Sequence, residues 1–444
     1  MDWISPRVWA GIPGCAAFLL LLGRPLVAAD PPTGDKPRER AEVRVARLIK
    51  DLGARDFPTR SGAHQQLSKL GPHSRGQLEK ALEDPDPEIR LRAGQLLAQL
   101  KLDELWAPSR VSIRATGETA SKILLALAEQ SGNHIHVGDP YGTFAEGKID
   151  ADYADVGYWE AVDDICRRTG NRLRPHYDMH TPGVVVSAGS PGNYPLAYAG
   201  PVRAQITSAK RQFIEELNYE ENKSELAHSF HVNVQFSWED RFRIVGYATQ
   251  PELVEGVTDN QAIISAAQPS GSGWNATSRG LRQVTATLKL NPIPVSATSL
   301  AVFTIRWGLV AVGEPATLEI SELEPGQVHS QDDVAVRIES IEKQSAGKYL
   351  VTLLVLRDLA MPDPYEIVFR EYEAELVDRQ DQVFRVQNFT PALTERGVQL
   401  RITFHGESAE SEPKLLKLHY PRLRARRDVR LTFRNVPLPV GRPE

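Results

Sequence analysis

The sequence predicts a multidomain α+β protein, in which a short helical segment precedes a small βαββαβ module and two β-sandwich-like domains. Three observations carry this prediction. The chain has 444 residues, enough for several domains. Apolar residues recur at helical spacing over residues 41–102, whereas beyond residue 200 they alternate with a period of two. Between these regions, residues 110–188 repeat a strand, helix, strand pattern.

Residues 1–29 have the pattern of a secretory signal peptide. Arg7 supplies a positive start, residues 16–22 are apolar, and small residues 27–29 precede Asp30. We expect cleavage after residue 29, with retention as an uncleaved anchor as the alternative. No later segment reaches the roughly 20 apolar residues that a membrane span needs. The sequence therefore predicts an exported protein of the periplasm or cell envelope, without a transmembrane span in the mature chain.

Residues 30–40 form a charged, proline-rich leader that we expect to be disordered. The helical pattern that follows, over residues 41–102, is interrupted at Pro58, at Pro72 and at the pair Pro85 and Pro87. Proline starts helices more readily than it continues them. Four short helices are therefore predicted.

The turns between these helices resemble those of HEAT-type repeats in exported bacterial proteins. The resemblance lies in residues 55–60 (RDFPTR), 70–72 (LGP) and 84–90 (DPDPEIR). It implies a protein-binding role. Two helical hairpins are fewer than an extended HEAT surface needs, so we expect them to form a cap.

Residues 110–188 contain an internal duplication. Residues 113–135 can be laid on residues 151–173, and apolar positions then meet apolar positions. Gly132 and Gly170 end the two helices. The economical fold is a pair of split βαβ units, with one small sheet under two helices.

Within this module, residues 126–137 (ALAEQSGNHIHV) resemble the short N-terminal domain of secretins and TonB-dependent receptors. The resemblance implies a periplasmic protein-interaction module. No secretin pore sequence follows, so the pore function is not implied.

Residues 189–200 are rich in proline and glycine and predict a linker. A faint second duplication follows, in which residues 206–212 resemble residues 338–344, and residues 317–323 can be laid on residues 430–436. We therefore predict two similar β-sandwiches, at 201–326 and 327–438, with one larger assembly as the alternative.

Candidate catalytic and metal-binding residues are few. His134 and His136 share one face of a predicted strand, and His176 and His180 lie near the partner repeat, so these four are weak metal candidates. Cys166 occupies an apolar helix position and is interpreted as a core thiol. No catalytic signature such as G-x-S-x-G occurs, so we predict neither an enzyme nor a cofactor.

The net charge of −5 implies no general polyanion-binding surface, and nucleic acid is not expected as a partner. One local bias stands out, because residues 414–434 hold eight basic side chains and one acidic one. Loop aromatic residues could add to an interaction surface. The predicted surface consists of Tyr141, Phe144, Trp274, Arg422, Arg424, Arg426 and Arg430. The alternative is that these arginines protect exposed sheet edges.

These observations favour an exported, non-enzymatic scaffold or interaction protein of the bacterial envelope. Its partner would be an envelope protein or an anionic wall polymer. One alternative is a cell-envelope hydrolase or carbohydrate-binding protein, with an aromatic cleft and paired carboxylates between the small module and the first sandwich. The other is a periplasmic metal-binding protein.

Overall fold

The computed structural model describes residues 36–138, 143–175, 183–189, 192–218, 220, 223–267, 273–277, 281–331, 334–356, 365–422 and 424–439. The predicted signal peptide lies outside these residues, as do residues 30–35 of the predicted leader. The chain is multidomain and mostly β, with about 24% helix and 51% strand. It divides into two compact units, an N-terminal unit ending at Leu97 and a C-terminal unit from Ala98 onward.

Helices make up the described part of the N-terminal unit. They are α1 (Lys36–Leu52), α2 (Phe57–Leu70), the 3-10 helix η1 (Gly71–Ser74), α3 (Arg75–Ala81) and α4 (Pro87–Trp106), which continues into the C-terminal unit. The four predicted α-helices and their proline breaks are confirmed, but α1 already begins at Lys36, within the predicted leader. Among the described residues, no helix is both long and apolar enough to cross a membrane.

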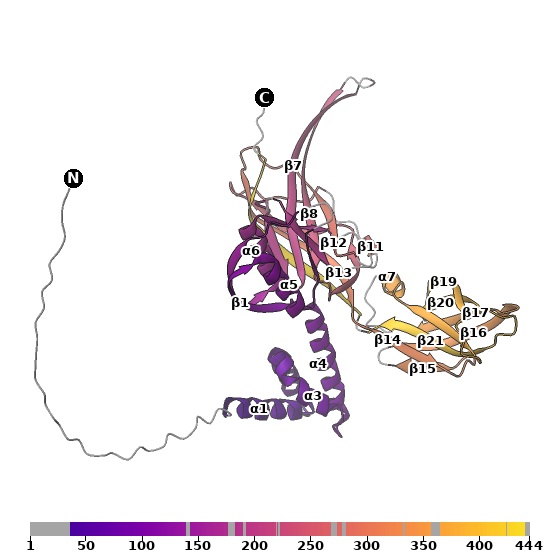
Figure 1. The fold of residues 1–444 in the computed structure, drawn as a ribbon. Helices are drawn as coiled ribbons and strands as arrows, with labels where there is room; N and C mark the ends of the chain where they lie inside the picture. The colour runs from indigo at the N-terminus through magenta and orange to yellow at the C-terminus, as the bar shows by residue number, and fades with distance from the viewer. Residues whose placement is uncertain are drawn as a thin grey trace, which may run out of the picture. The chain divides into compact units, whose positions relative to one another are not determined.

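The small module, residues 110–188, opens the strand-rich part of the chain (Figure 1). Its elements are β1 (Arg110–Thr119), α5 (Ala120–Ser131), β2 (Ile135–Val137), β3 (Lys148–Gly157), α6 (Tyr158–Thr169), β4 (Asn171–Pro175) and β5 (Val184–Ala188). The repeated strand, helix, strand order is confirmed. Gly132 and Gly170 end α5 and α6 in the same left-handed conformation, with φ of 68° and 69°.

The prediction of one small sheet in this module is wrong, because its strands form two sheets. β1 pairs antiparallel with β3, and β2, β5 and β4 form the second sheet. Arg114 lies opposite Asp152, its equivalent in the duplication, so the β1–β3 pair has the symmetry of the repeat. β5, which follows both copies, separates β2 from β4.

Two sheets facing a common core, here called the first sheet pair, follow the small module. One sheet has the order β12 (Gln283–Leu290), β8 (Lys223–Trp238), β7 (Val202–Asn218), β6 (Leu196–Ala199). The other has the order β10 (Glu252–Thr258), β13 (Ser299–Val312), β9 (Arg243–Ala248), β11 (Trp274–Ala276), and β22 (Arg424–Pro437) also pairs with β13. Phe236 stacks on Trp307 in the core, with ring centroids 3.9 Å apart.

The second sheet pair has the same plan. One sheet has the order β15 (Val328–Gln331), β16 (Val334–Ser345), β17 (Lys348–Leu356), β20 (Gly397–His405), β19 (Arg385–Thr394). The other has the order β14 (Pro315–Ile320), β21 (Pro413–Pro421), β18 (Glu373–Asp378), and the short helix α7 (Tyr365–Phe369) precedes β18. Alternate residues of these strands fill the core, which confirms the predicted period of two.

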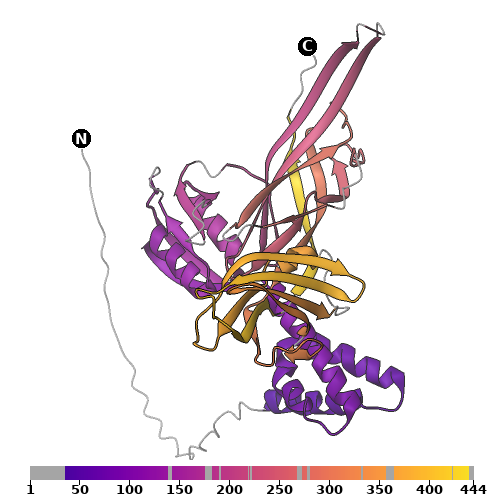
Figure 2. The ribbon, with the colours of Figure 1, turned by 90° about the vertical axis from the view of Figure 1, so that its right-hand side faces the viewer.

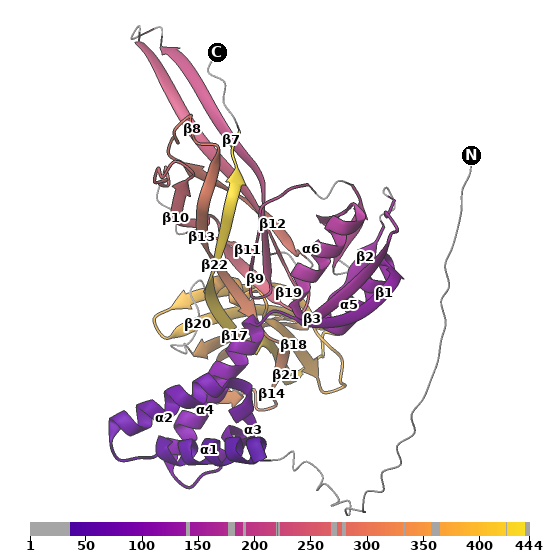
Figure 3. The ribbon, with the colours of Figure 1, turned by 90° about the vertical axis from the view of Figure 1, so that its left-hand side faces the viewer.

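The boundary predicted between residues 326 and 327 does not match the strand pairing. β14 follows β13 in the chain but pairs with β21 in the second sheet pair, and β22 follows β21 but pairs with β13 in the first. The register of this pairing is unbroken from Ser299 opposite Pro437 to Ile320 opposite Leu416. β13–β14 and β21–β22 therefore form one continuous antiparallel ladder through both sheet pairs, and Figure 3 shows β22 lying along β13.

β7 and β8 extend beyond the other strands of their sheet. They pair with each other as far as Asn218 opposite Lys223, whereas the pairing of β12 with β8 ends at Leu290 opposite Phe230. Among the described residues, no third strand pairs with the remaining length. Figures 1 and 2 show this two-stranded ribbon projecting past its neighbours.

Candidate functional site: a cationic cleft

A cleft of about 990 Å³ lies between the small module and the first sheet pair. The small module contributes α6 and β4, and the first sheet pair contributes β6, β7, β8 and β22. Among the described lining residues, five are arginines and only one, Asp163, carries a carboxylate. The charged and aromatic lining residues are Asp163, Arg167, Arg172, Arg174, Tyr194, Arg203 and Arg434.

The floor of the cleft holds a buried ion pair. The Asp163 carboxylate accepts hydrogen bonds from Nε and Nη2 of Arg203 at 2.7 and 2.8 Å, and from the Tyr198 hydroxyl at 2.8 Å. The side chains of Asp163 and Arg203 are 7% and 5% exposed. Burial, followed by the nearby Asp163 charge, raises the pKa of Tyr198. Because Asp163 is already bonded on both oxygens, it neutralises Arg203 and leaves the remaining arginines to give the cleft its charge.

Two arginines at the rim are exposed and face no acid. Arg172 is the second residue of β4 and Arg434 lies near the end of β22, and neither side chain forms an ion pair or hydrogen bond with another described residue. Arg167 is different, because its guanidinium lies 3.2 Å from the Asp164 carboxylate. Arg172 and Arg434 are therefore the rim cations best placed to contact an anionic group.

Residues 192–196 form another wall, although the sequence predicts a linker over 189–200. Leu196–Ala199 forms β6 and pairs with β7, so this segment belongs to the sheet. Gly192 has φ of +62°, and a side chain there would collide with the Tyr194 ring. Glycine thus lets the loop fold onto Tyr194, which is 39% exposed at the cleft.

Cys166 lies under the cleft as a core thiol. It is 3% exposed, and burial, together with the nearby Asp163 charge, raises its thiol pKa to about 12. We expect an aromatic disulfide reagent to leave Cys166 unmodified at pH 8 in the folded protein and to modify it rapidly in denaturant, because the thiolate is the reacting form. An ordinary thiol rate in the folded protein would contradict this burial.

The raised pKa of Cys166 also makes stability depend on pH. The unfolded thiol loses its proton near pH 9, whereas the folded one keeps it to about pH 12. The folded state therefore binds more protons in this window, and its stability decreases as pH rises through it.

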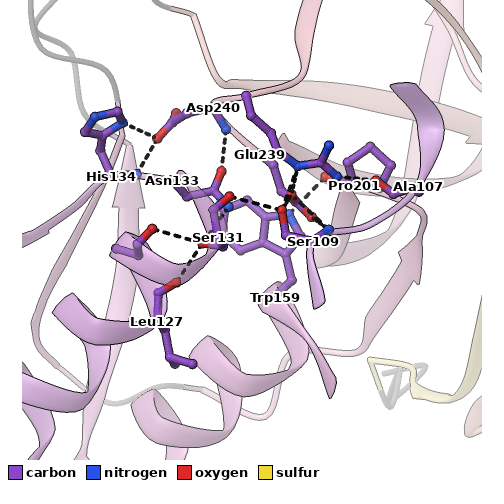
Figure 4. A network of polar contacts seen from close by, with 12 residues as sticks. Ala107, Ser109, Leu127, Ser131, Asn133, His134, Trp159, Pro201, Glu239 and Asp240 are labelled. Carbon is purple, nitrogen blue, oxygen red and sulfur yellow. Dashed lines mark hydrogen bonds and ion pairs between the residues drawn. The ribbon is translucent and has the colours of Figure 1, made fainter. Parts of the chain in front are cut away.

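A buried polar joint fixes the start of the small module against the first sheet pair (Figure 4). The Glu239 carboxylate, whose side chain is fully buried, accepts hydrogen bonds from the Ser109 amide at 3.0 and 3.2 Å. It also accepts bonds from the Ser109 hydroxyl and from Nε of Arg241, 3.0 Å away. The Trp159 indole donates to the Pro201 carbonyl at 3.0 Å, which ties α6 to the start of β7.

Asp240 extends this joint through both its side chain and its backbone. Its carboxylate accepts from the His134 amide at 2.7 Å and lies 3.1 Å from Nε of Arg282, while its own amide donates to Asn133. The two walls of the cleft are therefore connected by directional bonds through buried groups, which favours one fixed geometry.

The predicted metal residues do not form a recognisable site within the described chain. The His134 side chain is 58% exposed, and its Nδ1 lies 3.4 Å from the Asp240 carboxylate. His136 lies on β2, whereas His176 and His180 fall outside the described residues. No group of three or more potential ligands was found among the described positions.

The predicted interaction residues are dispersed. Trp274 lies on β11 with the Arg426 guanidinium 4.9 Å from its ring centroid, and Phe144 packs against the small-module core. Arg424 is buried and donates to the Tyr372 hydroxyl. Arg430 is exposed opposite Arg306 on β13. Arg422 is exposed just before β22, and Tyr141 lies outside the described residues. Among the described residues, Trp274 and Arg426 therefore lie together, whereas Phe144 belongs to the small module.

Sequence patterns pointed to few of the arginines in the cleft. Arg434 belongs to the basic segment at 414–434, but Arg167, Arg172 and Arg174 were not selected. A signal was present, because residues 167–174 (RRTGNRLR) hold four arginines and no acid. Their meeting with Arg203 and Arg434 depends on tertiary packing.

Comparisons with known proteins add no assignment. No family model, no curated protein and no solved structure matches this chain.

Proposed function

We propose that this chain is an exported, non-enzymatic interaction protein of the bacterial envelope, and that its cationic cleft binds an acidic segment of a partner protein. The observation that carries the proposal is the excess of arginine in the cleft, with Arg172 and Arg434 exposed and without a described acidic partner. Guanidinium groups bind carboxylates in a planar, bidentate geometry.

The rest of the lining supports a peptide as the ligand. Gln205 and Gln235 lie opposite each other on β7 and β8, and both line the cleft with Asn435. Side-chain amides can donate to and accept from a peptide backbone. The volume of the cleft is close to the upper limit for small-molecule pockets, which is roughly 1,000 Å³. An acidic stretch of chain therefore suits this cleft.

We further propose that the helices of the N-terminal unit are a HEAT-like pair. The Arg60 guanidinium donates to the carbonyls of Ala54 and Arg55, and in the later turn the Arg90 guanidinium donates to those of Asp84 and Pro85. This repeated contact supports the equivalence of the two turns. The secretin-like interaction role of the small module is part of the same proposal.

We also propose that the two sheet pairs are duplicated β-sandwiches. The pairing of β7 with β8 shifts register after Ile206, and the pairing of β16 with β17 shifts after Ile338. These residues are equivalent in the faint sequence duplication. An irregularity at the same aligned position supports a common origin.

The hydrolase and carbohydrate alternatives receive less support from the cleft, although it lies where they require a site. They call for paired carboxylates and several aromatic walls. Among the described lining residues, Asp163 is bonded to Arg203, and Tyr194 is the one aromatic side chain. The metal-binding alternative depends on His176 and His180, outside the described residues.

The proposed function predicts binding of a fluorescent poly-glutamate peptide at low salt. We expect the double variant Arg172→Glu/Arg434→Glu to bind at least about tenfold more weakly, since each charged hydrogen bond contributes about 1.5–3 kcal/mol. Fluorescence anisotropy at low protein concentration measures this.

The matched control is Arg385→Glu/Arg396→Glu, which makes the same charge change at exposed positions in the second sheet pair. It should bind nearly as the parent does. Equal losses in both variants would reduce the effect to net charge and contradict the proposal. Binding of an anionic wall polymer in place of the peptide would assign the cleft to polymer recognition.

A further inference from the structure

We propose that the acidic tip of the β7–β8 ribbon from a second copy of this chain occupies the cationic cleft, so that copies associate head to tail. This inference rests on the proposed function, because it uses the same cleft and names the partner segment. Three features carry it: the charges of tip and cleft, the unsupported ribbon, and its length.

The charges of the two surfaces are complementary. Residues 215–225 (EELNYEENKSE) contain five glutamates and one lysine, for a formal charge of −4. The described lining of the cleft contains five arginines and one aspartate, for a formal charge of +4. Opposite potentials favour encounter and fix the register of docking.

The ribbon lacks support within its own chain. Beyond Phe230 opposite Leu290, the described strands give β7 and β8 no third partner, and an isolated two-stranded hairpin is marginally stable in water. Docking into the cleft of another copy would give this length of ribbon a partner that the described strands of its own chain do not supply.

The ribbon cannot place its tip in the cleft of its own chain. Thr207 lines the cleft, and Asn218 lies eleven residues further along the same strand β7. At a rise of about 3.3 Å per residue, this separates them by about 36 Å. While β7 remains a strand, the tip can reach only the cleft of another copy.

Such a contact joins two different surfaces and is therefore heterologous. A pair joined in this way keeps one vacant cleft at one end and one vacant tip at the other. Successive copies then form either a closed ring or an open filament. Because the two surfaces differ, a variant altered in the tip and a variant altered in the cleft should complement each other. An isologous dimer, which uses the same surface on both copies, would not show this complementation.

The test is sedimentation velocity of the full mature chain at rising concentration, at about 50 mM and about 500 mM salt. We expect association at low salt that weakens at high salt. The tip variant Glu216→Lys/Glu225→Lys and the cleft variant Arg172→Glu/Arg434→Glu should each associate at least about tenfold more weakly. Circular dichroism and thermal melting check that both variants fold.

The deciding measurement mixes the two variants. The cleft variant supplies a parental tip, and the tip variant supplies a parental cleft. We therefore expect the two variants to form a 1:1 dimer. This dimer cannot extend, because the two altered surfaces that remain are close to neutral. Failure to restore the dimer, or association that neither variant weakens, overturns the inference. A parent chain that binds poly-glutamate in its cleft yet stays monomeric also overturns it, while leaving the proposed function intact.

Discussion

Replacing Asp163 with asparagine is expected to destabilise the small module and the first sheet pair by about 3–5 kcal/mol, because it leaves a buried guanidinium without its counter-charge. The Arg203 side chain is 5% exposed, and arginine cannot shed its charge by losing a proton. An asparagine accepts one of the two Arg203 hydrogen bonds and presents an NH2 group to the other. Thermal unfolding followed by tryptophan fluorescence measures the loss.

The adjacent Asp164→Asn is the matched control. Asp164 pairs with Arg167 and Arg168, whose side chains are 61% and 39% exposed. Such surface pairs contribute up to about 1 kcal/mol. Similar losses at both positions would show that burial does not set the strength of the Asp163–Arg203 pair.

Glu239→Ala is expected to lower stability by about 3 kcal/mol, or about 6–12 °C in the unfolding midpoint, because it removes the acceptor at the centre of the polar joint. The buried Ser109 amide and hydroxyl lose the carboxylate as their hydrogen-bond acceptor, and Nε of Arg241 loses the same acceptor. Limited proteolysis near Ala107 should become faster, since Arg241 also bonds that carbonyl.

The milder substitution Glu239→Gln keeps one acceptor oxygen and should lower stability by less than Glu239→Ala does. Glu252→Ala serves as the exposed control, because the Glu252 and Arg306 side chains are 47% and 49% exposed. Its midpoint should stay close to that of the parent. A parental midpoint and an unchanged cleavage rate in Glu239→Ala would refute the structural role assigned to the joint.

Local elements were predictable from the sequence because local patterns determine them. Prolines separate the described helices of the N-terminal unit, and Gly132 and Gly170 adopt the left-handed conformation that ends α5 and α6. Alternating residues on β8, β12, β16 and β20 predicted strands with one buried face. The core position of Cys166 followed from its alignment with Ala128 in the repeat.

Strand pairing could not be predicted in the same way. β14 and β22 each follow a long strand after a short connection, so local rules favour a hairpin within each predicted domain. The observed pairing sends each strand to the other sheet pair. Alternation of apolar residues specifies which face of a strand is buried, but not which sheet receives the strand.

The cleft was unpredictable for a related reason. Arg172, Arg203 and Arg434 come from three distant segments, and Tyr194 comes from a stretch that reads as a linker. Residues 167–174 are rich in arginine, but the other segments have the composition of an ordinary surface. Their combined charge arises only when the small module and the first sheet pair are joined through Glu239 and Asp240.

The continuous ladder through both sheet pairs also determines when the protein can finish folding. Thr304 on β13 meets Thr432 on β22, with the two hydroxyls 3.1 Å apart across 128 residues of chain. Contacts between such distant positions close slowly. The sheet containing β13 therefore stays incomplete until β22 pairs with it. Until that pairing forms, β13 has an open edge, and an unpaired strand edge makes an incompletely folded chain prone to aggregation.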